Sequence, residues 1–196
     1  MEMPSFSLIA TIFILTNPIG YAPAILAQVK QFPFEKQKSI LLREASFALL
    51  IAFFFQFFGE AFLSLLHVHS FAVSICGGII LLLSSLGMMF SEKEDEHYKE
   101  EAKEPFIIPI ATPFLAGGGL LTVVMLYSQQ LAPSVISLAI VLAWIGVFAV
   151  MFAAPYGYRF LGRRGFAVIE QIMGMITLMI AVDLLVHGFG HFFQSL

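Results

Sequence analysis

Residues 49–55 read LLIAFFF and residues 79–83 read IILLL, two uninterrupted apolar runs. Only helices and closed barrels can satisfy their backbone polar groups inside a lipid bilayer. The strands of a membrane barrel alternate polar with apolar residues, and these runs do not alternate. We therefore predict an all-α membrane protein.

Similar apolar runs along the chain predict six transmembrane helices. A helical span needs about 20 mainly apolar residues. The chain has 196 residues, of which 59% are hydrophobic and 12% are charged, and its mean hydropathy is +0.92. A soluble domain usually carries about twice that share of charged residues. We place the spans at about residues 6–28, 45–66, 71–90, 106–127, 135–156 and 166–189.

The basic residues predict how these helices are oriented. All ten Lys and Arg residues lie within residues 30–44, 91–105 and 159–164, and with six spans these segments share one side of the membrane. Because Lys and Arg collect in cytoplasmic loops, both termini are expected to lie outside. A net charge of −3 and the absence of a basic face argue against nucleic acid as a partner.

The charged segment 91–105 divides the chain into two halves, residues 1–90 and 106–196. We interpret this segment as a solvated cytoplasmic linker. Each half holds three predicted spans, and an odd number of spans means that the halves enter the membrane from opposite faces. Short internal similarities, such as those around Pro18 and Pro113, favour two inverted three-helix repeats.

Helix-breaking residues fall inside the first and fourth predicted spans. They are Pro18, Gly20 and Pro23 in the first, and Pro109, Pro113, Gly117, Gly118 and Gly119 in the fourth. Proline removes a backbone donor and clashes with the preceding turn, so both helices are expected to break near the membrane midplane. Interrupted helices in inverted halves are typical of the binding site of a transporter. Ordinary proline kinks are the alternative interpretation.

Several segments along the chain also match a known family in its own order. They are residues 17–20 (NPIG) with Pro23, 43–45 (REA), 77–79 (GGI), 109–113 (PIATP), 115–117 (LAG) and 173–174 (MG). In these segments the chain resembles the MarC family of small bacterial inner-membrane proteins, a group that includes neutral amino acid transporters. The resemblance implies six spans, external termini, a place in the bacterial inner membrane, and export or exchange of small neutral amino acids. This chain departs from the family pattern at Tyr21, Gly118, Gln171 and Asp183.

The two breaks offer groups that suit an amino acid. Free N–H groups at the start of an inner half-helix favour a carboxylate, and side-chain and backbone oxygens favour an ammonium group. The predicted solute contacts are Thr16, Asn17, Gly20, Thr112, Gly117, Gly118 and Gly119. For the two threonines the alternative is a hydrogen bond to a carbonyl of their own helix.

Other polar residues lie at the predicted outer ends of the helices. Glu60 and Asp183 are candidates for carrying a coupling proton, since carboxylates within spans are functional hypotheses; the alternative is that both reach the outer interface. Four histidines gather at these ends, namely His67, His69, His187 and His191. The last two are spaced like paired metal ligands, but interfacial polar residues are the favoured interpretation, and no metal site is assigned.

The sequence supports three functional hypotheses. The first is a secondary transporter of small neutral amino acids or similar metabolites that works by alternating access. The others are a divalent-cation exporter and a non-transporting membrane assembly protein. An enzyme is not expected, because the usual hydrolase and zinc-protease motifs are missing. The expected partners are a small solute and the lipid bilayer, with a homo-oligomer left open, and no cofactor is predicted.

The only cysteine, Cys76, lies in an apolar run. A single cysteine excludes an internal disulfide and a Cys-based zinc site. We expect Cys76 to be a small buried packing residue beside Gly77.

Overall fold

The computed structural model describes residues 4–90, 105–108 and 110–194, and it describes Arg163 by its backbone alone. The regular secondary structure within these ranges is helical, without a β-strand, and an isolated bridge joins Phe106 to Ile108. Most of the charged linker, together with Pro109, lies outside the described residues. The prediction of an all-α membrane fold is therefore confirmed for the described chain.

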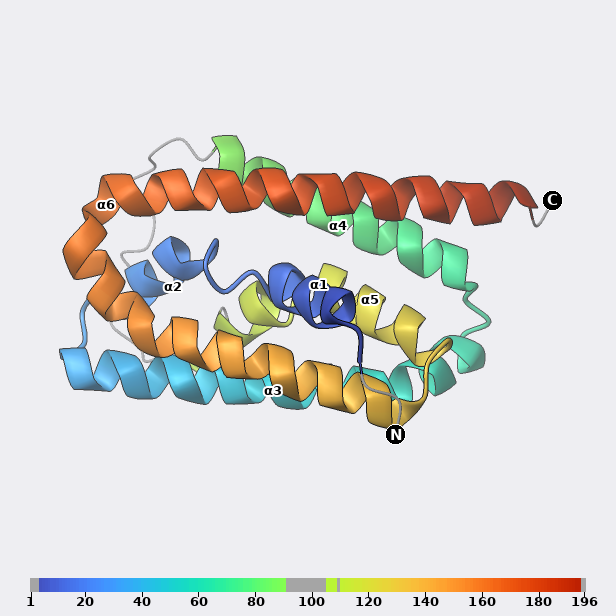
Figure 1. Cartoon of the computed structure of the whole chain (residues 1–196), viewed down its shortest axis with the longest axis horizontal. Helices are drawn as coiled ribbons and strands as arrows, with labels where there is room; N and C mark the ends of the chain where they lie inside the picture. The colour runs from blue at the N-terminus through green and yellow to red at the C-terminus, as the bar shows by residue number, and fades with distance from the viewer. Residues whose placement is uncertain (1–3, 91–104, 109, 195–196) are drawn as a thin grey trace.

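Long helices form the outside of the bundle (Figure 1). They are α3 (Phe34–Leu65), α4 (Ser70–Phe90) and α6 (Pro133–Gln194). Helix α6 turns back on itself at Gly162, whose φ of +65° and ψ of −175° suit only glycine. The turn divides α6 into Pro133–Gly162 and Arg164–Gln194, so the described chain has four helices long and apolar enough to cross a membrane.

Shorter helices lie between the long ones in Figure 1. They are α1 (Phe6–Thr16), α2 (Ala22–Val29), the π-helical turn η1 (Ile110–Leu115) and α5 (Gly118–Ser128). The first predicted span is thus broken between α1 and α2, and the fourth between η1 and α5. The first break contains Pro18 and Gly20, and the second contains Gly117, residues that disfavour a helix interior. Pro23 lies instead in the first turn of α2, where proline is tolerated, and Gly118 and Gly119 begin α5.

Helix α3 begins well before the predicted span at 45–66. Pro33 precedes its first residue, a position that suits proline because the fixed φ is compatible with a helix start. The added turns are amphipathic, with Glu35 exposed and Ile40 and Leu41 buried. The predicted apolar window began only at residue 45, so the prediction missed earlier turns whose inner face is buried by the rest of the bundle.

Glycines allow α4 and the second half of α6 to pack closely. A Cβ at Gly78 would lie 3.1 Å from the carbonyl oxygen of Ala181, and one at Gly174 would lie 3.2 Å from that of Ser85. Small residues let membrane helices approach in this way. The expectation of a buried Cys76 is wrong: it is exposed, because Gly77 and Gly78 face inward and their neighbour points outward.

Candidate functional site

Asn17 organises the first helix break. It ends α1 in the left-handed conformation, with φ 46° and ψ 47°, which Asn tolerates better than most residues. The side chain is fully buried, and its Oδ1 accepts a hydrogen bond from the N–H of Gly20 at 3.1 Å. Its Nδ2 lies 3.4 Å from Thr177 Oγ1 on α6 and 3.4 Å from the sulfur of Met88 on α4. One buried amide thus connects the break to two long helices.

Gly20 is required by this arrangement. A Cβ at this position would lie 2.4 Å from Asn17 Oδ1, closer than non-bonded atoms approach. Thr16 behaves differently, since its Oγ1 donates to the carbonyl of Ile12 at 2.8 Å. For Thr16 the alternative of a hydrogen bond within its own helix is therefore confirmed.

The turn that precedes the second break contains an extended residue. Thr112 has φ −133° and ψ 129°, inside the segment that forms η1. The glycines that follow lie against α4: a Cβ at Gly118 would meet Ile80 at 2.8 Å, and one at Gly119 would meet Leu81 at 2.2 Å. These glycines therefore let α5 begin in close contact with α4, a packing role that sequence reasoning had not considered.

Tyr21 joins the two breaks. Its hydroxyl forms a hydrogen bond with the Ser84 hydroxyl of α4, and its ring centroid lies 5.3 Å from that of Phe114 in η1. Sequence reasoning had noted Tyr21 only as a departure from the family pattern. Its role depends on a contact between segments far apart in the chain, so no local signal announced it.

Two helices begin at the breaks without a side-chain cap. The N-cap residues are Tyr21 for α2 and Gly117 for α5, and neither makes a side-chain hydrogen bond to the first turn. The first N–H groups of a helix have no partner within it, and the macrodipole places partial positive charge there. The N–H of Ala22 donates to the carbonyl of Ile19, and Pro23 has no N–H, so α2 offers little to an anion. The start of α5 is the helix end that favours one.

A cavity of about 750 Å³ opens between α1, α4, α5 and the second half of α6. Its polar lining includes Thr11, His69, Gln129, Asp183, His187 and His191. We call this side of the bundle the histidine end. None of the predicted solute contacts belongs to the cavity lining. Asp183 does belong to it, whereas Glu60 is exposed and does not.

A polar pair lies at the histidine end. His187 Nδ1 lies 3.4 Å from Asp183 Oδ1, and both side chains are largely exposed. Within the described ranges, no three His, Cys, Asp or Glu side chains come close enough together to hold a metal ion. The arrangement does not add support to the hypothesis of a divalent-cation exporter.

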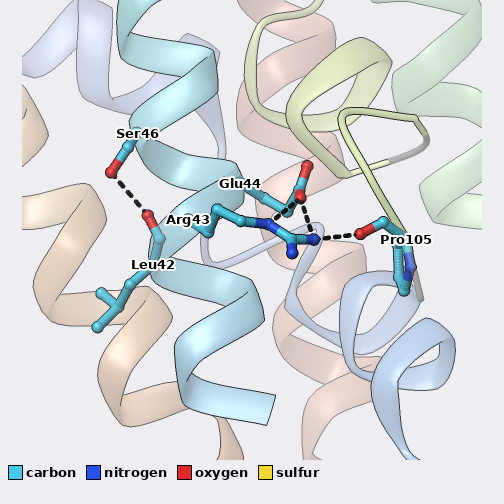
Figure 2. Close-up of polar contacts among 5 residues, drawn as sticks. All are labelled: Leu42, Arg43, Glu44, Ser46 and Pro105. Atoms are coloured by element: carbon cyan, nitrogen blue, oxygen red, sulfur yellow. Dashed lines mark hydrogen bonds and ion pairs between the residues drawn. The ribbon is translucent and has the colours of Figure 1, made fainter. Parts of the chain in front are cut away.

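Glu44 is a buried carboxylate that sequence reasoning missed. Its side chain is 0% exposed, and Arg43 donates to its Oε1 from Nε at 3.1 Å and from Nη2 at 2.9 Å. Figure 2 shows the guanidinium of Arg43 between this carboxylate and the carbonyl of Pro105, to which Nη2 also donates. Among the described residues, Glu44 Oε2 has no hydrogen-bond partner.

The sequence did contain a signal for Glu44. The residue was left outside the predicted spans because the apolar window began at residue 45. Buried residues on α3 recur at helical spacing on both sides of it, at Ile40, Leu41, Ala45 and Ala48. A helical periodicity that continues through an acid predicts that the acid faces the interior.

Comparisons with known proteins agree with this membrane fold. The chain matches the profile of the MarC family integral membrane proteins over residues 4–193. The chain belongs to the MarC family. It is 33% identical to the UPF0056 inner membrane protein YhgN of Escherichia coli over 180 residues, 90% of this chain and 91% of the relative.

Further MarC relatives are of similar length and similarity. A UPF0056 membrane protein of Buchnera aphidicola subsp. Baizongia pistaciae is 30% identical over 93% of this chain and 94% of its own length. One of Chlamydia muridarum is 30% identical over 96% and 94%. No solved structure matches the chain. MarC membership and the membrane-spanning helices identify a multi-pass protein of the bacterial inner membrane.

Proposed function

We propose that this MarC family protein is a secondary transporter that exports or exchanges small neutral amino acids, or similar small metabolites, by alternating access. The observation that carries the proposal is the pair of broken helices, whose uncapped inner ends are held together by Tyr21. Irregular backbone inside a membrane is tolerated only within protein or beside water, and transporters use it to hold solutes.

The proposed topology has six spans. Helices α1 and α2 form the first, and η1 with α5 forms the fourth, so that residues 1–90 and 106–196 are inverted repeats on either side of the linker. Lys38 and Tyr156, 3.2 Å apart between Nζ and Oη, lie at the end of the bundle opposite the histidine end, and we name it the basic end. By the distribution of Lys and Arg, the basic end is cytoplasmic and both termini are outside.

The proposed transport cycle starts from the asymmetry between these ends. The cavity opens at the histidine end, whereas Arg43, Pro105 and Phe106 are in contact towards the basic end. This arrangement matches an outward-facing state, in which a solute leaves or enters through the cavity. Rocking one half against the other would close the cavity and open the basic end.

The proposed solute site combines opposite charges. The solute carboxylate binds at the uncapped start of α5, where N–H groups and the helix dipole favour an anion. Asn17 and the backbone beside Gly20, Thr112 and Gly117 to Gly119 orient the ammonium group. Asp183, which lines the cavity, is the better placed candidate for carrying a coupling proton, and the exposed Glu60 is the other.

The test is solute flux in proteoliposomes that contain the purified protein. A panel of labelled neutral amino acids is compared for the wild type, Asn17→Ala and the control Gly87→Ala, a site with no atom near an added Cβ. We expect wild type and control to transport at least one solute and Asn17→Ala to lose at least about tenfold in rate, the effect of losing roughly 1.4 kcal/mol of solute binding. Folded wild-type protein without flux for any solute would favour an assembly role instead.

A second comparison separates the two carboxylates. If Asp183 carries the coupling proton, Asp183→Asn should abolish uptake driven by a pH gradient and preserve exchange of solute for solute. The same behaviour in Glu60→Gln, with a normal Asp183→Asn, would transfer the role to Glu60.

A further inference from the structure

The carboxyl group of Glu44 is paired in an incomplete way. Arg–carboxylate pairs are strongest as a fork, with two N–H groups on two oxygens. Here Nε and Nη2 of Arg43 both donate to the same carboxylate oxygen, Oε1. Oε2 is buried, with no hydrogen-bond partner in the part of the chain that the structure describes.

Glu44 lies where the second broken span begins. It is ten residues after Phe34 in α3, or about 15 Å along the helix at 1.5 Å per residue. Helix α3 packs against η1, and the Arg43 guanidinium lies 5.4 Å from the ring of Phe106, just before that turn. The carboxylate is therefore beside the segment that would move when the basic end opens.

A purely structural role does not explain this carboxylate. Arg43 by itself anchors the segment through the Pro105 carbonyl. A buried carboxylate is costly when its hydrogen-bonding capacity is not filled, and buried ion pairs are often replaced by apolar residues without loss of stability. Ionisable groups within membrane helices accordingly tend to serve the passage of solutes or ions.

We propose that Oε2 of Glu44 binds a small monovalent cation during transport. The proposal rests on the transport function inferred above. The cation is either the ammonium group of a neutral amino acid or a co-transported Na⁺. A zwitterion brings no net charge to the buried Arg43–Glu44 pair, whereas Na⁺ brings one positive charge. This difference in charge favours the ammonium group.

The experiment measures flux by the full chain in proteoliposomes for alanine and for lactate, which is similar in size but has no ammonium group. The variants are Glu44→Gln, Glu44→Asp and the control Glu35→Gln, an exposed carboxylate on the same helix. We expect Glu44→Gln to raise the KM for alanine at least about tenfold, because the substitution removes a hydrogen bond between charged groups. The KM for lactate should stay the same, and the control should match the wild type.

A second set of assays replaces Na⁺ by choline. If the cation is Na⁺, choline raises the wild-type KM, and Glu44→Gln no longer responds to Na⁺. If the cation is the ammonium group, choline has no effect on either protein. Alanine flux by Glu44→Gln equal to that of the wild type in both media overturns the proposal. Should Glu44→Gln fail to fold, Glu44→Asp must show a raised KM for alanine, with an unchanged KM for lactate if the cation is the ammonium group and a raised one if it is Na⁺. A wild-type KM for both solutes would also overturn the proposal.

A binding measurement separates failure of this proposal from failure of the transport function. Alanine or NaCl, compared with choline chloride, should raise the Tm of wild-type protein in detergent by about 2–4 °C, because a ligand of the native state stabilises it. Glu44→Gln should show no such shift. If the wild type binds the ligand but does not transport it, only the transport function is refuted. If the Tm shifts equally in wild type and Glu44→Gln, or shifts in neither, a cation site at Glu44 is refuted.

Discussion

The indole N–H of Trp144 donates a hydrogen bond of 2.8 Å to the backbone carbonyl of Ala45. Both residues are fully buried, and the bond joins the first half of α6 to α3 one residue away from Glu44. A helix carbonyl shared with an indole fixes the rotation of α3, and hence the direction in which the Glu44 side chain points.

Trp144→Phe should therefore destabilise the protein. The substitution removes the hydrogen bond and part of the ring volume, for an expected loss of about 1–2 kcal/mol. In a protein of this length that corresponds to a fall in Tm of roughly 2–8 °C. Thermal unfolding in detergent measures it, and an unchanged Tm would show that the bond contributes nothing to stability.

Gly20→Ala should be destabilising, whereas Gly87→Ala should not. The added methyl at position 20 would collide with the Asn17 amide, and overpacking of this kind costs about 1–3 kcal/mol. At position 87 there is no atom within 4 Å of an added Cβ, so the gain in helix propensity should stabilise by about 0.5–1 kcal/mol. The contrast in sign is the prediction, measured by thermal unfolding of both variants.

Tyr21→Phe and Ser84→Ala should have effects that do not add. Each removes the hydrogen bond between their hydroxyl groups, at a cost of about 0.5–1.5 kcal/mol, while Tyr21→Phe keeps the ring beside Phe114. The double variant should resemble either single one, giving a coupling energy of at least about 0.5 kcal/mol. Additive losses would mean that the hydroxyl groups act separately.

Thiol labelling should place the two ends of the bundle on opposite sides of the membrane. In the cysteine-free background Cys76→Ser, Lys30→Cys and Arg164→Cys should react with an impermeant maleimide only from the cytoplasmic side. His69→Cys and His191→Cys should react only from outside, because both line the cavity at the histidine end. Labelling of all four positions from one side would reject the proposed topology.

Much of the architecture could be predicted because its causes are local. Apolar runs long enough to cross a bilayer need no partner to be recognised, and Pro18 and Pro113 disrupt a helix through their own covalent geometry. The positions of the breaks were predicted correctly for this reason. The MarC family assignment likewise rested on short motifs in sequence order, and the comparisons confirm it.

Whether an individual side chain points towards the lipid or into the bundle could not be predicted in the same way. In a membrane helix the apolar residues continue all round, so hydrophobicity does not separate the lipid-facing side from the packed side. Cys76 was therefore assigned to the interior although it is exposed. Glu44 was missed for a different reason, because the predicted span began at residue 45 although the periodicity of buried residues continues through position 44.

The sequence by itself determined the helical membrane class, the places where helices break and the family, because each depends on residues adjacent in the chain. The tertiary structure alone decided that Tyr21 meets Ser84, that Gly119 packs on Leu81 and that Glu44 is enclosed with one oxygen unpaired. These contacts join distant segments, and the rotation of each helix in the bundle sets them.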